Sequence, residues 1–204
     1  LDIVTGGGKT VIIACCIVYL KKCHDIDKFL ILTPNTIVRD RLSDDFAQVI
    51  NGKETKTVFQ RFGIILEKEW EETKDEYDLA ITSVHGSNDL ASKPIILSNI
   101  QQLYYSEKSS ENAKQKLASI YNHCNKIAVF NDEAHNTKAE EYENVLATIK
   151  PKLAFRLDTT ATPERADGKI PDSRKVYEFG VREALKLNLV KHVHVFEPVI
   201  HDYE

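Results

Sequence analysis

A glycine-rich turn followed by lysine and threonine is the first group of residues that can do chemistry. Its residues are Thr5, Gly6, Gly7, Gly8, Lys9 and Thr10. Glycines let backbone N–H groups turn inward around a phosphate, and a helix that starts there directs its N-terminal dipole at the same anion. Lys9 would reach the β- and γ-phosphates, and the Thr10 hydroxyl would ligate Mg²⁺. The full pattern has Gly or Ala where this chain has Ile3, so a plain glycine-rich turn stays the alternative.

An acidic pair follows an apolar run later in the chain. Asp132 and Glu133 come after the segment KIAVF, within the text NDEAH. At the carboxyl end of a parallel strand beside a phosphate loop, Asp132 is placed to hold Mg²⁺ through water. Glu133 is suited to orient and deprotonate an attacking water, and His135 would couple this site to whatever binds above it. The alternative is an ordinary solvated acidic turn.

The elements that must position these residues alternate between strand and helix patterns. The helix over residues 9–23 is apolar on nearly every face, which predicts burial on both sides and core positions for Cys15 and Cys16. Strands alternating with helices predict an α/β domain whose mostly parallel sheet carries helices on both faces. Strands are predicted at residues 1–4, 29–34, 57–62, 78–84, 93–99, 126–132, 153–161 and 192–196, and further helices at 36–50, around Trp70, from 100, and at 111–123, 139–149 and 181–187.

Composition excludes several classes of protein. The chain has 204 residues, of which 42% are hydrophobic, so it can bury a core and is not a disordered tail. Its net charge of −4 gives no bulk positive field for nucleic acid or an acidic membrane. The longest apolar run, residues 11–20, is too short to span a bilayer, and the cysteines lack metal-ligand spacing, which predicts a reduced, cytoplasmic protein. There is no methionine, so we expect a piece of a longer protein.

Four motifs in order carry a resemblance to a known group. TGGGKT, LTPN, DEAH and TATP resemble motifs I, Ia, II and III of superfamily 2 helicases and translocases. The segments LTPNTIVRDRL, PIILSNIQQLY and FNDEAHNTKAEEY are most similar to the motor subunits of type III and type I restriction enzymes. The resemblance implies a RecA-like P-loop NTPase domain, the first of two motor domains, over residues 1–165. Residues 166–204 resemble the segment that connects it to the second.

The resemblance also implies roles for individual residues. ATP and Mg²⁺ would be the ligands, with Thr10 and Asp132 on the metal and Lys9, Asp132 and Glu133 catalytic. The glycine turn from Thr5 to Thr10 would bind the nucleotide. Three residues would couple this site to the nucleic-acid path: His135, Thr160 and Thr162. The phosphate backbone of DNA would be touched by Thr33, Pro34, Asn35 and Arg39, with Asn99 and Gln101 in a second contact. A helix cap is the alternative for the first of these groups, and a cap or solvated face for the second.

The predicted function is therefore the nucleotide-binding half of an ATP-dependent DNA helicase or translocase, the motor of a restriction enzyme. Its partners would be DNA, a second RecA-like domain and a methyltransferase subunit. An RNA helicase of the same superfamily and a non-hydrolysing ATP-binding scaffold stay open as alternatives. The arginine finger belongs to the second domain, so we expect the isolated fragment to be nearly inactive.

Overall fold

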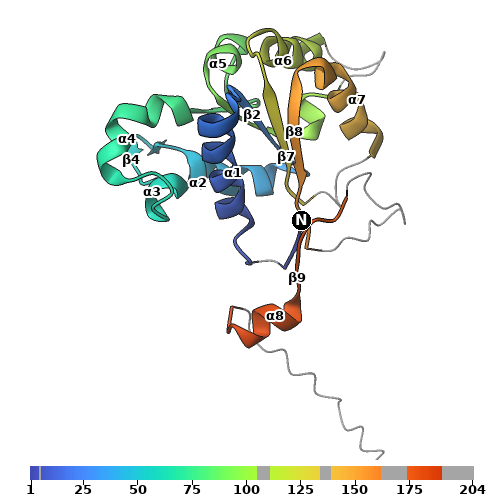
Figure 1. Ribbon diagram of the computed structural model, residues 1–204. Helices are drawn as coiled ribbons and strands as arrows, with labels where there is room; N and C mark the ends of the chain where they lie inside the picture. Colours follow the sequence, from blue (N-terminus) through green and yellow to red (C-terminus); the bar gives the residue numbers. More distant parts are fainter. Residues whose placement is uncertain (5, 105–110, 134–138, 162–173, 190–204) are drawn as a thin grey trace, which may run out of the picture.

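Five parallel strands form the central sheet of this computed structural model (Figure 1). The structure describes residues 1–204 except 5, 105–110, 134–138, 162–173 and 190–204. The strands lie in the order β5-β6-β2-β7-β8, and every neighbouring pair is parallel. Their bounds are β2 Lys28–Thr33, β5 Leu79–Ile81, β6 Ile95–Asn99, β7 Ile127–Asn131 and β8 Leu153–Asp158.

The strand that leads into the glycine turn lies beside the end of β8. This strand, β1 (Asp2–Ile3), pairs in parallel with β9 (Glu178–Phe179). The N–H of Ile3 donates to the carbonyl of Thr160, just past β8, at 2.7 Å. The segment after residue 165 therefore returns to the phosphate-loop strand, while the domain boundary at that residue stays a prediction.

Helices cover both faces of the sheet, as predicted, because side chains alternate along its strands. Phe29 and Ile31 of β2 join the core under one set of helices, whereas Leu30 and Leu32 join the core on the other face. The first set is α1 Lys9–His24, α2 Thr36–Phe46, α3 Val58–Arg61 and α4 Glu67–Thr73, and the second is α5 Ser87–Ser92, α6 Glu111–Asn122 and α7 Ala139–Ile149 (Figure 1). The α/β class is thus confirmed.

The remaining described elements are β3 Val49–Ile50, β4 Lys53–Glu54, η1 Lys74–Tyr77, η2 Ile100–Gln102, η4 Lys150–Lys152 and α8 Val181–Lys186.

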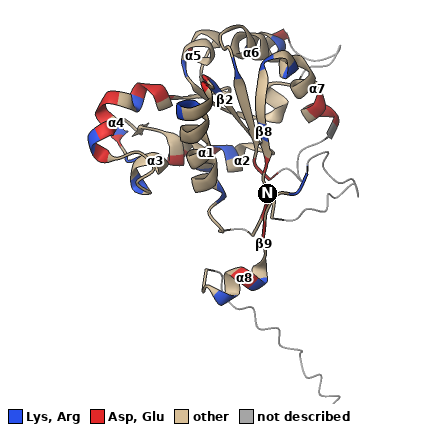
Figure 2. Ribbon diagram, viewed as in Figure 1, with Lys and Arg blue, Asp and Glu red and all other residues tan. Residues whose placement is uncertain are grey.

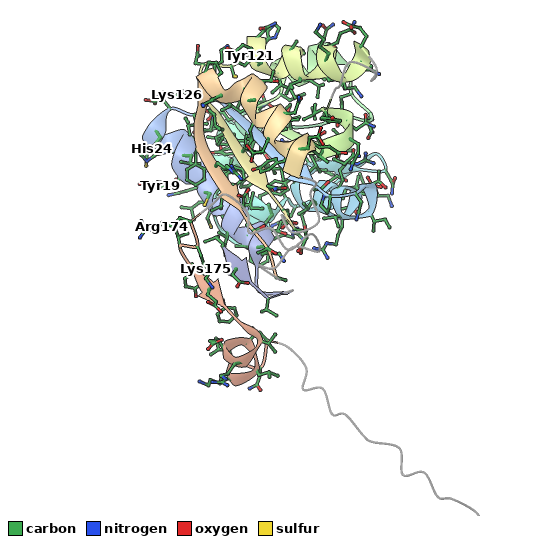
Figure 3. All side chains as sticks on the ribbon, turned by 90° about the vertical axis from the view of Figure 1, so that its right-hand side faces the viewer. Tyr19, His24, Tyr121, Lys126, Arg174 and Lys175 are labelled. Carbon is green, nitrogen blue, oxygen red and sulfur yellow. The ribbon has the colours of Figure 1, made fainter. Side chains whose placement is uncertain are left out.

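Lysines at the amino ends of three strands hold the ends of three helices. Lys28 at the start of β2 is buried, and its Nζ donates to the carbonyl of Ala91 in α5 at 2.8 Å. Lys126, before β7, donates to the carbonyl of His24 at 3.0 Å (both labelled in Figure 3). Lys152 donates to the carbonyls of Tyr121 in α6 and of Cys124 just after it. Cations suit the negative ends of helix dipoles. These contacts anchor the amino edge, and the opposite edge carries the predicted site.

Two of the predicted elements differ from the structure, one in its end and one in its type. The helix predicted over residues 36–50 ends at Phe46, and Val49 lies exposed in β3. The strand predicted over residues 57–62 is the short helix α3, because a capping box starts it: the Thr57 N–H donates to the Gln60 side chain at 3.1 Å. The strand predicted at 192–196 lies outside the described residues.

The first helix is buried on one side rather than both. Cys15 is exposed, so its predicted core position is wrong, whereas Cys16 is half-buried and packs against the core. Tyr19 is also exposed on α1 and meets the His24 ring edge-on, with 5.2 Å between centroids (Figure 3). In the described part of the chain, no helix combines the length and apolarity that crossing a membrane requires.

Candidate functional site

The glycine turn is folded in a way that side chains would prevent. Gly6 and Gly8 have φ of 83° and 86°, a left-handed conformation that favours glycine. A Cβ on Gly7 would lie 2.6 Å from the side chain of Ile3, and the Gly7 N–H donates to the carbonyl of Val4 at 2.9 Å. A close backbone cradle of this kind suits a phosphate group. Thr5 lies outside the described residues.

Helix α1 begins directly at this turn and directs its amino end at the same place. Gly8 is its N-cap, no side chain caps it, and its first turn contains no acidic residue. The first N–H groups of a helix have no partner within the helix, so an anion here would satisfy them and the positive end of the dipole. This is the observation on which the fit of a phosphate ligand rests.

Lys9 and Glu133 meet across this cradle. The Nζ of Lys9 lies 2.6 Å from Oε1 of Glu133, although the two residues are 124 apart in the chain. Their side chains are only 9% and 19% exposed. Glu133 has φ of 53°, and the left-handed region costs a non-glycine residue roughly 1–2 kcal/mol. Strained backbone of this kind is concentrated at functional sites.

Asp132 is the buried member of the acidic pair. It is 3% exposed, its N–H continues the sheet by donating to the carbonyl of Leu32 at 2.9 Å, and its Oδ1 accepts from the Thr159 hydroxyl at 2.8 Å. Burial raises the pKa of Asp132, with the charge of Glu133 acting in the same direction, while the Thr159 hydrogen bond and Lys9 oppose the rise. A nearby cation would stabilise the ionised carboxylate.

Thr159 is the residue that sequence reasoning missed. Three threonines stand close together in the text DTTATP, and the prediction selected Thr160 and Thr162. In the structure Thr160 contacts the phosphate-loop strand through its backbone, accepting from the Ile3 N–H and donating to the carbonyl of Leu1 at 2.9 Å. Thr162 and His135 lie outside the described residues. The signal that could have identified Thr159 is its position, because it carries a hydroxyl and comes directly after β8, the strand beside β7.

A pocket of about 460 Å³ joins these groups. Thr10 lines it beside Lys9, Asp132 and Glu133. Thr10 and Asp132 supply two oxygen donors for a hard divalent cation, and phosphate oxygens and water would complete its shell. The described residues form no group of three or more His, Cys, Asp or Glu around a shared metal position. The donor set thus fits Mg²⁺ that arrives with a phosphate ligand.

The predicted nucleic-acid residues lie along the same carboxyl edge of the sheet. Thr33 ends β2 and is the register partner of Asn99, which ends β6. Asn35 is exposed and caps α2, with its Oδ1 accepting from the Val38 N–H at 3.0 Å. Asn35 therefore acts as a helix cap, which was the alternative to nucleic-acid binding. A contact between Asn35 and nucleic acid stays a prediction.

The remaining members of this group are largely engaged within the domain. Pro34 is half-buried, and Arg39 is 8% exposed with its guanidinium on Asp40 Oδ1 at 2.7 and 2.9 Å. Asn99 donates to Gln101 at 3.0 Å, while its buried Oδ1 has no hydrogen-bond partner among the described residues. Figure 2 shows acidic residues concentrated on α4.

Comparison with known proteins matched one family and several solved structures, two of which follow. The family described as type III restriction enzyme, res subunit, matches residues 1–165. The UvsW helicase from bacteriophage T4 matches at 16% identity and TM-score 0.44, over 82% of this chain and 48% of that chain. The SWI2/SNF2 ATPase core of Sulfolobus solfataricus in complex with dsDNA matches at 19% identity and TM-score 0.40, over 80% and 27%. The chain thus spans less than half of either structure. No curated protein matches it.

The family match covers most of the chain and includes every element that lines the pocket. The glycine turn, the acidic pair and the strand ends described above all lie within residues 1–165. The chain belongs to the family of type III restriction enzyme res subunits.

Proposed function

We propose that this domain binds ATP with Mg²⁺ and hydrolyses it to drive movement along DNA. The observation that carries the proposal is the convergence of Lys9, Asp132 and Glu133 on a glycine cradle at the start of α1. This one pocket contains a suitable group for each of three tasks: binding phosphate, holding a divalent cation and accepting a proton from water.

Each group has a stated part in binding. Backbone N–H groups of the turn from Thr5 to Gly8 would hold the phosphates, and Lys9 would place its charge on the γ-phosphate. Thr10 and Asp132 would hold Mg²⁺, which neutralises charge that develops on the phosphate oxygens. Burial of Asp132 keeps this carboxylate oriented, and the Thr159 hydroxyl holds one of its oxygens in place.

Glu133 is the proposed base for the attacking water. The water oxygen forms a bond to the γ-phosphorus, the bond from that phosphorus to the bridging oxygen breaks, and the water proton goes to the Glu133 carboxylate. In the structure this carboxylate is paired with Lys9. Phosphate binding would draw the ammonium away, which frees the carboxylate to accept a proton.

Movement along DNA is proposed through the carboxyl edge of the sheet. Thr33, Asn35, Arg39 and Asn99 would contact the phosphate backbone there, with Pro34 shaping the turn. Such contacts are local, which is how a chain with net charge −4 would bind a polyanion. His135, Thr160 and Thr162 would couple this edge to the nucleotide site, since the carbonyl of Thr160 already accepts from the strand before the glycine turn.

We also propose a second motor domain and a partner subunit outside this domain. Residues 166–204 would lead to a second RecA-like domain that supplies an arginine finger, and a methyltransferase subunit would be the partner in restriction. The family membership supports both proposals. Without the second domain we expect turnover by this fragment to be slow, by a factor of about 10³ to 10⁵.

The test is ATP hydrolysis by the full-length protein, with its second motor domain present, in the presence of duplex DNA, single-stranded DNA and RNA of equal length. We expect stimulation by DNA and its loss in Lys9→Ala. Stimulation by RNA alone would favour the RNA helicase alternative. ATP binding without turnover under every condition would contradict hydrolysis and favour the scaffold.

A further inference from the structure

The pocket beside the glycine turn has a second wall that phosphate chemistry does not use. It comes from α2 and α3, and α3 contacts both α1 and α2 (Figure 1). This wall combines an aromatic ring, two arginines, one aspartate and two valines. Its residues are Val38, Arg41 and Asp45 of α2, and Val58, Arg61 and Phe62 at α3. The whole pocket is within the size range of small-molecule sites.

Helix α3 is held firmly against the rest of the domain. Phe59 is fully buried, and its ring lies 4.9 Å from the Tyr77 centroid and 6.2 Å from the Trp70 centroid. Trp70 is itself buried, at 5% exposed. The guanidinium of Arg61 pairs with Asp45, which ties α3 to α2. A short helix anchored at both points presents its last residue at a fixed place.

Phe62 directly follows that last residue as the C-cap of α3, and it is 60% exposed. Single exposed apolar residues are common on proteins, so exposure alone argues for nothing. The place of this ring is what matters, because it lines the same pocket as Gly8, Lys9 and Thr10. Arg41 is exposed in the same wall and forms no ion pair with any described residue. The wall therefore offers a π face and an unengaged positive charge.

We propose that Phe62 is the platform on which the base of the bound nucleotide stacks, while Arg41 adds positive charge to the same pocket. The inference rests on the proposed function, because it requires the phosphates to occupy the glycine cradle. The two walls of the pocket then hold the two ends of one nucleoside triphosphate. Stacking reads the face of a base and not its edge, so this platform accepts adenine and guanine alike.

The test compares a ligand that has a base with one that lacks it. Calorimetry measures Mg–ATP and Mg–tripolyphosphate binding to the purified wild-type protein and to Phe62→Ala. Loss of base stacking weakens ATP binding by roughly 5- to 150-fold. Tripolyphosphate binding stays unchanged, GTP loses as much affinity as ATP, and Phe62→Trp restores both nucleotides.

Two matched variants separate the possible outcomes. Tyr19→Ala removes an equally exposed ring from the other end of α1 and leaves both ligands unaffected. Lys9→Ala weakens ATP and tripolyphosphate together, which tests the phosphate cradle by itself. Full ATP affinity in Phe62→Ala would overturn the inference and leave the cradle standing. Equal losses for ATP and tripolyphosphate in a folded Phe62→Ala would also overturn it, because the ring would then only shape the turn.

Discussion

The ammonium of Lys9 and the carboxylate of Glu133 lie 2.6 Å apart, so the proposed phosphate ligand and the proposed base neutralise each other. Glu133→Gln removes the charge that competes for Lys9. We expect ATP to bind roughly five-fold tighter or more, since an ion pair of about 1 kcal/mol no longer opposes it. Hydrolysis should fall by about 10² to 10⁴, the usual contribution of a general base.

Titration calorimetry and a steady-state ATPase assay measure the two effects of Glu133→Gln. Glu72→Gln, an exposed change on α4, is the matched control and should alter neither quantity. Weaker ATP binding in Glu133→Gln would show that the carboxylate supports the cradle rather than competing with phosphate.

Thr159 positions Asp132, and its removal should affect stability and metal use together. Thr159→Val keeps the shape of the buried side chain but removes the hydrogen bond to Oδ1. Leaving that carboxylate without its donor should cost about 1–3 kcal/mol of unfolding free energy. The apparent Mg²⁺ requirement of the ATPase should rise as well, because one ligand oxygen is no longer held.

Urea unfolding and a Mg²⁺ titration of ATPase activity test this prediction. Thr159→Ser retains the hydroxyl and should restore the Mg²⁺ requirement even if some stability is lost with the methyl group. A Thr159→Val protein that loses stability at an unchanged Mg²⁺ requirement would limit Thr159 to a packing role.

Asp27 gives the fold a stability that depends on pH. Its carboxylate accepts from the N–H groups of Asn125 and Lys126, at 2.9 Å in each case, and so ties the start of β2 to the start of β7. Partial burial alone would raise the pKa of Asp27, but these hydrogen bonds lower it below its usual value. The contribution is therefore complete above the unfolded pKa of about 3.9 and is lost as pH falls through the lower folded value.

Asp27→Ala should destabilise the protein by about 1 kcal/mol at pH 7, a small value because the site is partly exposed. The difference from wild type should shrink as pH falls below about 4 and through the lower folded pKa, where the wild-type carboxylate becomes protonated too. Urea unfolding at several pH values measures both, with exposed Asp75→Ala as control. A difference that does not change with pH would mean that Asp27 acts through shape and not through charge.

The strands of the sheet were predictable because apolar runs bounded by polar residues leave few alternatives. β7 lies within its predicted range, and β2 starts and ends one residue earlier than predicted, at Lys28 and Thr33. Lys28 is buried because its Nζ meets the carbonyls at the end of α5, and no local pattern reveals a partner that lies 63 residues away. Long-range pairing of this kind is a property of the folded chain alone.

Some features of the site depend on local sequence, and others depend on residues that are distant in the chain. The glycine turn was readable because its conformation depends on Gly6 and Gly8 themselves. Alternation predicted a strand at residues 57–62, but the Thr57–Gln60 capping box favours a helix, and the place of Phe62 follows from that helix. The choice of Thr159 over its neighbours depends on which hydroxyl faces Asp132, and only the register of β8 against β7 decides that.

Variants of Arg39 and Asn35 distinguish a charge contact with DNA phosphate from a contribution to the stability of α2 at the proposed DNA-binding edge. Arg39→Gln removes a charge, so a phosphate contact by this guanidinium predicts weaker DNA binding and a salt-dependence slope lower by about 0.9 on duplex DNA. Asn35→Ala removes the cap of α2 and should cost about 1 kcal/mol of stability without changing the slope, because no charge is lost.

Fluorescence anisotropy at several salt concentrations measures the slopes. Lys68→Gln on acidic α4 is the matched loss of charge and should leave the slope unchanged. If Arg39→Gln, folded as stably as wild type, also keeps the wild-type slope, then its bond to Asp40 is structural and the DNA path lies elsewhere on this edge.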